Sequence, residues 1–278
     1  MTATNGAPGT AAHRPSRVIA RAARLAPRYA VAANVALFTI QDDSLKVLLV
    51  KRAAPPFGGT WGLPGGFVRR DESVDEAALR ELQEATGITT VYLEQLYTFG
   101  DLDRDPRAPP AFLRKQEGGA GTQSPKSLRD FWGPRGRVVA VAYYAVVGWI
   151  QFQLKAARNR RLTAAKWCEL ARLPVLAFDH RKIIAAALER LRNKVNYTSV
   201  AFQLLPKKFA LSELQRAYEV ILDQALDKRN FRKKMLQLGI LRNTGEHTTE
   251  GRQRPARLYS FTETRVIKFQ EKGIIVPF

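Results

Sequence analysis

The stretch GFVRRDESVDEAALRELQEATGI (66–88) carries charged residues with the types and spacing of a site for diphosphate chemistry. Glu81 and Glu84 lie three residues apart, and Arg80 lies four residues before Glu84. Residues at these spacings share one face of a helix, and Glu72 precedes that helix closely enough to reach its first turn. Clustered carboxylates hold Mg²⁺, and divalent metals neutralise phosphate oxygens and activate water. The pattern predicts a site that binds or cleaves a diphosphate.

One position on this acidic face is not an acidic residue. Position 85 lies four residues after Glu81, where a carboxylate would complete the face, but it is Ala85. This face therefore carries one carboxylate fewer, so hydrolysis and binding without hydrolysis both stay open. Three later carboxylates could replace the missing one: Asp101, Asp103 and Asp105.

The elements around this stretch alternate strands and helices. Ser73 followed by Glu76 predicts a capped helix start, and Gly87 predicts the helix end. QDDS marks a turn between the first two strands, and PPFGGTWGLPGG (55–66) is predicted to be a loop. Strands are expected at 29–40, 45–52, 91–101, 137–150 and in TAAKWCEL (163–170), and helices at 73–86 and 179–195.

Two segments have compositions that do not suit a packed core. Residues 1–28 contain five arginines and no acidic residue, which predicts a disordered basic tail. An organellar transit peptide is the alternative, although Gly and Pro weaken an amphipathic helix there. Residues 102–136 are rich in Pro, Gly and polar residues and are predicted to form a mobile loop.

A second unit begins near residue 197, from where basic side chains outnumber acidic ones. A turn at Pro206 precedes a helix, a second helix is predicted at 227–239, and two strands follow at 240–261 around a polar tip. Two helices and a hairpin describe a winged helix-turn-helix, whose second helix enters the major groove of DNA. The first of these helices has one apolar face, formed by Leu211, Leu214, Tyr218 and Ile221.

The second of these helices separates an apolar stripe, Phe231, Met235 and Leu238, from a basic face. Lys and Arg contact phosphates, Arg also reads guanine, and Asn reads adenine. The alternatives are a solvated basic face on a structural helix and an amphipathic membrane helix, although the apolar face lacks exposed Trp or Phe anchors. The candidate DNA contacts are Lys228, Arg229, Asn230, Arg232 and Lys233, with Arg252 and Arg254 at the hairpin tip.

Composition narrows the class of protein further. The 278 residues carry a net charge of +20 and the pI is about 10.5, which predicts a polyanionic partner. The single cysteine, Cys168, excludes a disulfide framework within the chain and is interpreted as a buried packing residue. No apolar run approaches the ~20 residues that cross a bilayer. We expect a cytoplasmic, nucleoid-associated bacterial protein.

The stretch 66–88 resembles the Nudix box, Gly-x5-Glu-x7-Arg-Glu-U-x-Glu-Glu-x-Gly-U with U aliphatic, except that Ala85 replaces a Glu. The matching positions are Gly66, Glu72, Arg80, Glu81, Leu82, Glu84, Gly87 and Ile88. With the winged helix, the chain resembles the NrtR family, the Nudix-related transcriptional regulators of NAD metabolism. Further similar strings are LEQLYTFGDLDRDPR (93–107), VVAVAYYAVV (138–147), LAFDH (176–180), ALDKRNFRKKMLQLGIL (225–241) and GRQRPARLYSF (251–261).

The resemblance covers roughly 29–261 and implies an α+β fold. A Nudix α/β/α sandwich at 29–195 would carry an insertion at about 108–134. A winged helix-turn-helix domain would follow at 196–278. The tail at 1–28 lies outside the resemblance.

The resemblance also implies a function. A homodimer would bind a palindromic operator near genes of NAD biosynthesis or salvage. ADP-ribose would change the spacing of the two DNA-reading helices and release the DNA, which needs different ligand affinities in the two conformations. The chain would then be a repressor that senses a breakdown product of NAD without destroying it.

The resemblance places the ligand contacts in the box and in the residues that precede it. Phe57 and Trp61 would stack on adenine or, alternatively, serve as plain core residues. Asp179 is interpreted as a helix N-cap and His180 as structural. The candidate ligand contacts are Arg52, Phe57, Trp61, Gly65, Gly66, Glu72, Glu81 and Glu84, with a weakened Mg²⁺ site at Glu81 and Glu84.

Two other functions stay open. The chain could be an ADP-ribose or nucleoside-diphosphate pyrophosphatase with an appended basic domain. It could also be a Nudix enzyme that acts on RNA ends, although the helix-helix-hairpin order favours duplex DNA. Ala85 discriminates between a sensor and an enzyme, because a restored acid should raise hydrolysis.

Overall fold

The computed structural model describes residues 29–54, 57–88, 91–101, 104, 137–148, 162–195, 199–248 and 255–262. Apart from Tyr29 and Arg137, all of these belong to one compact unit. The predicted basic tail and the predicted insertion at about 108–134 lie outside the described residues. No helix in the described ranges is long and apolar enough to cross a membrane.

The first part of the chain forms a mixed sheet with the strand order β3-β2-β1-β6-β5. β4 also pairs with β1, and β7 pairs with β2. The predicted hairpin is confirmed, because Gln41 pairs with Ser44 across a turn of two aspartates. The loop predicted at 55–66 is wrong in part, since it contains two short strands. The strands are β1 (Tyr29–Gln41), β2 (Ser44–Arg52), β3 (Trp61–Gly62), β4 (Gly65–Phe67), β5 (Glu94–Phe99), β6 (Arg137–Val146) and β7 (Leu162–Glu169).

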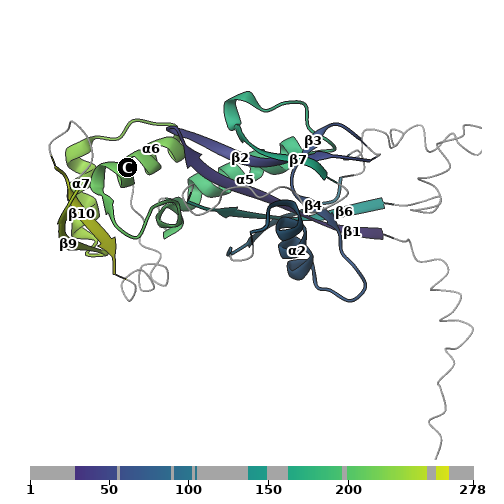
Figure 1. The fold of residues 1–278 in the computed structure, drawn as a ribbon, viewed down its shortest axis with the longest axis horizontal. Helices are drawn as coiled ribbons and strands as arrows, with labels where there is room; N and C mark the ends of the chain where they lie inside the picture. Colours follow the sequence, from purple (N-terminus) through teal and green to yellow (C-terminus); the bar gives the residue numbers. More distant parts are fainter. Residues whose placement is uncertain are drawn as a thin grey trace, which may run out of the picture. The chain divides into compact units, whose positions relative to one another are not determined.

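Helices cover both faces of this sheet (Figure 1). Successive strand residues point to opposite faces, so Val35 and Leu37 of β1 pack with α2 (Val74–Thr86), while Ala36 and Phe38 pack with α5 (His180–Val195). Cys168 of β7 is buried on the α5 side, as predicted, and burial raises the pKa of its thiol. The predicted α/β/α sandwich is therefore confirmed.

The helix of the charged stretch begins and ends where its caps predict. Ser73 accepts a hydrogen bond from the Glu76 backbone N–H, and the Glu76 side chain accepts one from Ser73 N–H, which is the reciprocal capping box. Gly87 ends α2 with a φ of 78°, a left-handed conformation that favours glycine. These local signals set the rotation of α2 and hence the direction of its carboxylates.

The second part of the chain is a winged helix (Figure 1). All four predicted apolar residues of its first helix are buried, and so are Phe231 and Met235 of the second. Tyr218 and Phe231 meet edge to face at 5.4 Å between ring centroids, which joins the two helices. The elements are η3 (Ser199–Leu204), β8 (Phe209–Ala210), α6 (Leu211–Leu222), α7 (Lys228–Gln237), β9 (Leu241–His247) and β10 (Arg257–Phe261), with the sheet order β8-β10-β9.

Candidate functional site

Arg80 of α2 gathers the box carboxylates around one guanidinium group. Its Nη2 and Nε donate to the two oxygens of Glu72 at 2.7 and 2.8 Å. Its Nη1 donates to Glu81 at 2.6 Å and lies 3.5 Å from Glu84. Spacing alone predicts the Arg80–Glu84 pair, but the shorter contacts go to Glu72 and Glu81. The reason is that Glu72 folds back over the helix, where it also accepts from the Arg69 backbone N–H.

The ion pair between Glu72 and Arg80 stays charged over a wide pH range. Hydrogen bonds from Arg80, and weaker ones from Arg69, lower the pKa of Glu72 from 4.5 to about 2. The same carboxylates raise the pKa of Arg80. The Arg69 guanidinium also lies 3.4 Å from Glu84. Two arginines therefore neutralise much of the acidic face from within the protein.

The glycines before α2 let the strands approach this cluster closely. A Cβ on Gly66 would collide with the Glu81 carboxylate, and a Cβ on Gly65 would collide with Asn34 and the Ala33 carbonyl. Glu81 is only 4% exposed, and Ala85, one turn later, is fully buried. The position without its acid is therefore a closed, apolar position beside a buried carboxylate.

One of the proposed substitutes for the missing acid contacts a lysine. Asp101 is exposed and lies 3.6 Å from Lys182, while Asp103 and Asp105 fall outside the described residues. Within the described ranges, no three His, Cys, Asp or Glu side chains gather as a metal site.

A cation and two aromatic rings meet beyond the end of β2. The Arg52 guanidinium carbon lies 5.1 Å from the Phe178 ring centroid, and the Phe57 and Phe178 rings meet edge to face at 4.7 Å. Arg52 and Phe57 were predicted as ligand contacts from the sequence, but Phe178 was not. No ring contact joins Trp61 to this group among the described residues, and Lys166 Nζ lies 4.2 Å from its ring centroid. We call Arg52, Phe57 and Phe178 the aromatic corner.

The segment that carries Phe178 is anchored by a buried ion pair. Arg104 Nε and Nη2 donate to the two oxygens of Asp179 at 3.0 and 2.8 Å, and both side chains are buried. Asp179 precedes α5 in the position predicted for an N-cap, and its backbone oxygen accepts from Lys182 and Ile183. The ion pair between positions 104 and 179 has no local sequence signal.

His180 has the structural role predicted for it. Its Nδ1 accepts a hydrogen bond from Leu63 N–H at 2.9 Å, and its Nε2 lies 3.5 Å from the Asn34 amide nitrogen. Burial, together with the charges of Arg104 and Arg52, lowers its pKa from 6.5 to about 3. The neutral imidazole of His180 therefore connects the start of α5 to Leu63, in the segment that leads into the box.

This neutral histidine predicts an acid-sensitive fold. In the unfolded chain His180 binds a proton near pH 6.5, whereas in the folded chain it does so near pH 3. The free energy of unfolding should therefore fall as pH drops from about 6.5 towards 3. His180→Asn keeps an acceptor near the Nδ1 position and should remove this part of the slope. Urea unfolding at several pH values measures the slope, with exposed His247→Gln as control; equal slopes for His180→Asn and the unaltered protein would refute the assignment.

The basic face of α7 is exposed, as predicted. Lys228, Arg229, Asn230, Arg232 and Lys233 are all exposed, while Phe231 and Met235 hold the opposite side in the core. Among the described residues, these lysines and arginines form no ion pair with each other or with the rest of the chain. Their charge is therefore available to an external anion.

Side chains of α6 fix the turn that leads into α7. Gln215 Nε2 donates to the Leu226 carbonyl at 3.0 Å, and the Glu219 carboxylate accepts from Leu226 N–H at 3.1 Å. Asp227 then caps α7 by accepting from Asn230 N–H at 2.7 Å. Polar contacts, two of them partly buried, thus fix the turn between the two helices. Arg252 and Arg254 of the predicted wing tip lie outside the described residues.

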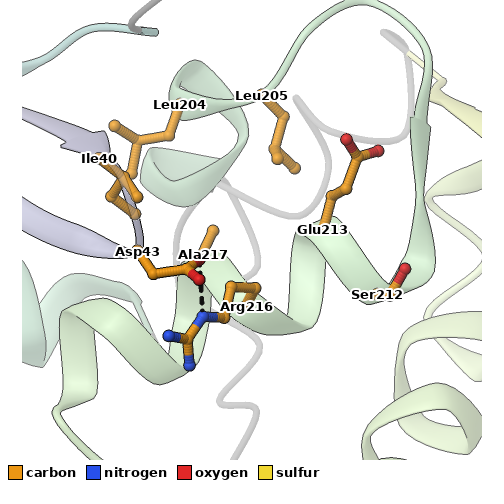
Figure 2. Close-up of a pocket in the computed structure, with 8 residues that line it drawn as sticks. All are labelled: Ile40, Asp43, Leu204, Leu205, Ser212, Glu213, Arg216 and Ala217. Atoms are coloured by element: carbon orange, nitrogen blue, oxygen red, sulfur yellow. Dashed lines mark hydrogen bonds and ion pairs between the residues drawn. The ribbon is translucent and has the colours of Figure 1, made fainter. Parts of the chain in front are cut away.

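The sheet domain contacts α6 at two places, the middle of the helix and its carboxyl end. Figure 2 shows Arg216 of α6 reaching Asp43 in the β1–β2 turn, with Nε to Oδ1 at 2.9 Å. At the carboxyl end, Arg192 of α5 donates to the Ile221 carbonyl at 2.9 Å and lies 3.6 Å from Asp223. A pocket of about 310 Å³ lies at the first contact, lined by Ile40, Asp43, Leu204, Leu205, Ser212, Glu213, Arg216 and Ala217 (Figure 2).

The fold and site together define a class of protein: a Nudix-type domain with an incomplete box, joined to a winged helix with an exposed basic second helix. The NUDIX domain family matches residues 29–187, and the NrtR DNA-binding winged helix domain matches residues 201–261. The chain belongs to the NrtR family.

Three known proteins illustrate the relationship. The chain is 33% identical to the ADPR responsive transcriptional repressor NtrR of Acinetobacter baylyi, over 82% of this chain and 80% of the relative. The crystal structure of Shewanella oneidensis NrtR with a 27mer DNA is 35% identical, with a TM-score of 0.65, 85% of this chain and 95% of that chain covered. An ADP-ribose pyrophosphatase of Methanocaldococcus jannaschii is 34% identical over 54% of this chain and 70% of the relative.

Proposed function

We propose that the protein is an ADP-ribose-responsive transcriptional repressor of genes for NAD biosynthesis or salvage. The observation that carries the proposal is the pairing, on one chain, of an incomplete diphosphate site with an exposed basic helix in a helix-turn-helix. The relative named as an ADPR responsive repressor and the solved NrtR–DNA complex support it. ADP-ribose is the effector, and duplex operator DNA is the partner.

Operator binding would use two copies of the chain. A helix-turn-helix reads a half-site through its second helix, and two-fold dimers read palindromes with half-sites one helical turn apart. In this chain Arg229, Arg232 and Lys233 would contact phosphates and guanine, while Asn230 would read adenine. Release then requires that ADP-ribose bind one spacing of the two helices more tightly than the other.

The coupling between ADP-ribose binding and DNA release would be transmitted through α5. This helix begins beside the aromatic corner at His180 and ends against α6 after 16 residues, a length of roughly 24 Å. Arg192 near its end holds the carboxyl end of α6, just before the turn into α7. A shift at the start of α5 would therefore reach the DNA-reading helix through packed contacts.

The test combines two measurements on the full chain. Phosphorus NMR follows ADP-ribose mixed with the protein and Mg²⁺, and fluorescence anisotropy follows a labelled operator duplex. We expect the diphosphate signals to shift while the molecule stays intact for hours, and we expect added ADP-ribose to release the duplex. DNA binding that ADP-ribose leaves unchanged at matched salt would contradict the proposed function.

The pyrophosphatase relative favours one alternative, a hydrolase with an appended basic domain. The described residues fit a two-metal clamp poorly, because Glu81 and Glu84 both contact Arg80 and Ala85 brings no oxygen. Mg²⁺ held weakly by Glu81 and Glu84 remains part of the proposal for ligand binding, where it would screen phosphate charge. Many turnovers to AMP and ribose 5-phosphate would favour the enzyme.

Ala85→Glu should restore a metal site at a cost in stability. Position 85 is fully buried beside Glu81, so a new carboxylate must be neutralised by a proton or a cation. We expect a lower Tm without metal, a rise in Tm on adding Mg²⁺ that the unaltered protein lacks, and a gain in ADP-ribose hydrolysis. Ala85→Gln is the matched control, since it adds nearly the same volume without the charge. An Ala85→Glu protein without Mg²⁺-dependent Tm or turnover would contradict our account of the missing ligand.

A further inference from the structure

Phe178 holds a backbone conformation that bulky residues avoid. Its φ is 52°, and the φ of its neighbour Phe57 is 62°. In the left-handed region the Cβ of an L-residue comes too close to the following carbonyl oxygen. The other non-glycine residues with positive φ in the described ranges are aspartates of a tight turn and a helix end, Asp42, Asp43 and Asp223. Strain at large residues persists where surrounding contacts impose it, and it concentrates at ligand sites.

Contacts on both sides of Phe178 impose this conformation. Before it, Ala177 N–H donates to the Trp61 carbonyl at 2.8 Å. After it, Asp179 is held by Arg104, and His180 accepts from Leu63 N–H. The backbone is therefore fixed independently of what the ring contacts. The consequence is that the direction of the Phe178 Cα–Cβ bond is set before any ligand arrives.

The chemistry around the ring suits a nucleobase that carries a phosphate. Phe178 is half-buried, with Phe57 against it edge to face and the Arg52 guanidinium over one face of its ring, which leaves stacking to the other face. An aromatic ring stacks on any base, with about 1–3 kcal/mol per base. The Arg52 guanidinium can take a phosphate in a bidentate contact. Trp61, the other aromatic predicted from the sequence, has a different cation over its ring, Lys166.

The aromatic corner and the box carboxylates are close enough for one ligand to contact both. Gly62 adjoins His180, and Gly66 adjoins Glu81. These glycines are four residues apart, and four extended residues span at most roughly 14 Å. A dinucleotide-like ligand could therefore place its base at the corner and its diphosphate and second sugar towards the box.

We propose that Phe178 is the base-stacking residue of the ligand site and that Arg104, through Asp179, is the residue that positions it. This assignment rests on the proposed binding of ADP-ribose. It names the part of the ligand that the corner recognises, the planar base, and it separates this contact from the recognition of ribose and phosphate by the box.

The test uses the full chain and three ligands. Phe178→Gly removes the ring and tolerates the left-handed backbone, so the fold should persist, which a thermal unfolding curve checks. Calorimetry with ADP-ribose and AMP should show affinities lowered by about 5- to 150-fold, which is the stacking energy converted to a ratio. Ribose 5-phosphate, followed by phosphorus NMR, should bind as before. Phe178→Tyr should restore base-dependent affinity, and exposed Tyr92→Ala serves as the control.

Each outcome decides between the assignment and its alternatives. Equal losses for ADP-ribose and ribose 5-phosphate would show that the ring only supports the fold of the site, and unchanged ADP-ribose affinity would show that the base lies elsewhere. Either result overturns the assignment. An unaltered protein that binds none of the three ligands would overturn the proposed function, and the base subsite with it.

Discussion

Replacing Arg229 and Arg232 with alanine is expected to weaken operator binding by at least roughly thirty-fold at a fixed salt concentration. Each arginine contact to a base or phosphate is worth about 1–3 kcal/mol, and 2 kcal/mol corresponds to about that ratio. Both side chains are exposed on α7, opposite the buried Phe231 and Met235, so the fold should be unaffected. ADP-ribose affinity should not change, because the substitutions lie in the other domain.

The salt dependence of binding identifies the type of contact. Each phosphate contact contributes about 0.9 to the slope of log affinity against log salt concentration. A double variant that lost two phosphate contacts should therefore show a slope lower by nearly two. Arg172→Ala with Lys182→Ala removes the same charge from the sheet domain and serves as the control. Anisotropy with equal affinities for both double variants would place the DNA surface elsewhere.

Replacing Arg104 with methionine is expected to lower the free energy of unfolding by about 3–5 kcal/mol. The Asp179 side chain is 4% exposed, so the substitution leaves a buried carboxylate without its bidentate partner. Removing Asp179 as well, in Arg104→Met with Asp179→Leu, should recover most of the loss, because an apolar pair of similar volume avoids the desolvation penalty.

Urea unfolding of the two single variants and the double variant completes a mutant cycle for this pair. The matched control is Arg172→Met, which breaks an exposed pair with Glu169 at 3.7 Å and should cost under about 1 kcal/mol. Additive effects at positions 104 and 179 would mean that the pair does not stabilise the fold. ADP-ribose affinity should fall in Arg104→Met, since the orientation of Phe178 depends on Asp179.

Much of the fold could be predicted because its signals are local. Ser73, Glu76 and Gly87 mark both ends of α2 within the helix itself. The apolar spacing of α6 and α7 is likewise a property of consecutive residues, and it predicted which face of each helix is buried. The two short strands β3 and β4 were missed, since two or three residues carry no period and their pairing depends on β1 and β2.

The candidate site likewise has some features that the sequence predicts and others that only the structure shows. The spacing of Arg80, Glu81 and Glu84 and the gap at Ala85 can be read from the sequence, because helical geometry places these positions on one side. The contact between Arg80 and Glu72 cannot, because it forms only where the segment before α2 folds back over the helix.

The sequence by itself therefore determined the two domains, the box with its missing acid and the basic face of α7. Only the tertiary structure decided that Phe178 joins Arg52 and Phe57, and that Arg104 meets Asp179 from 75 positions away. Caps and periodicity act between neighbours a few residues apart. Contacts across the sheet exist only after the packing of both its faces has fixed the register and brought distant segments together.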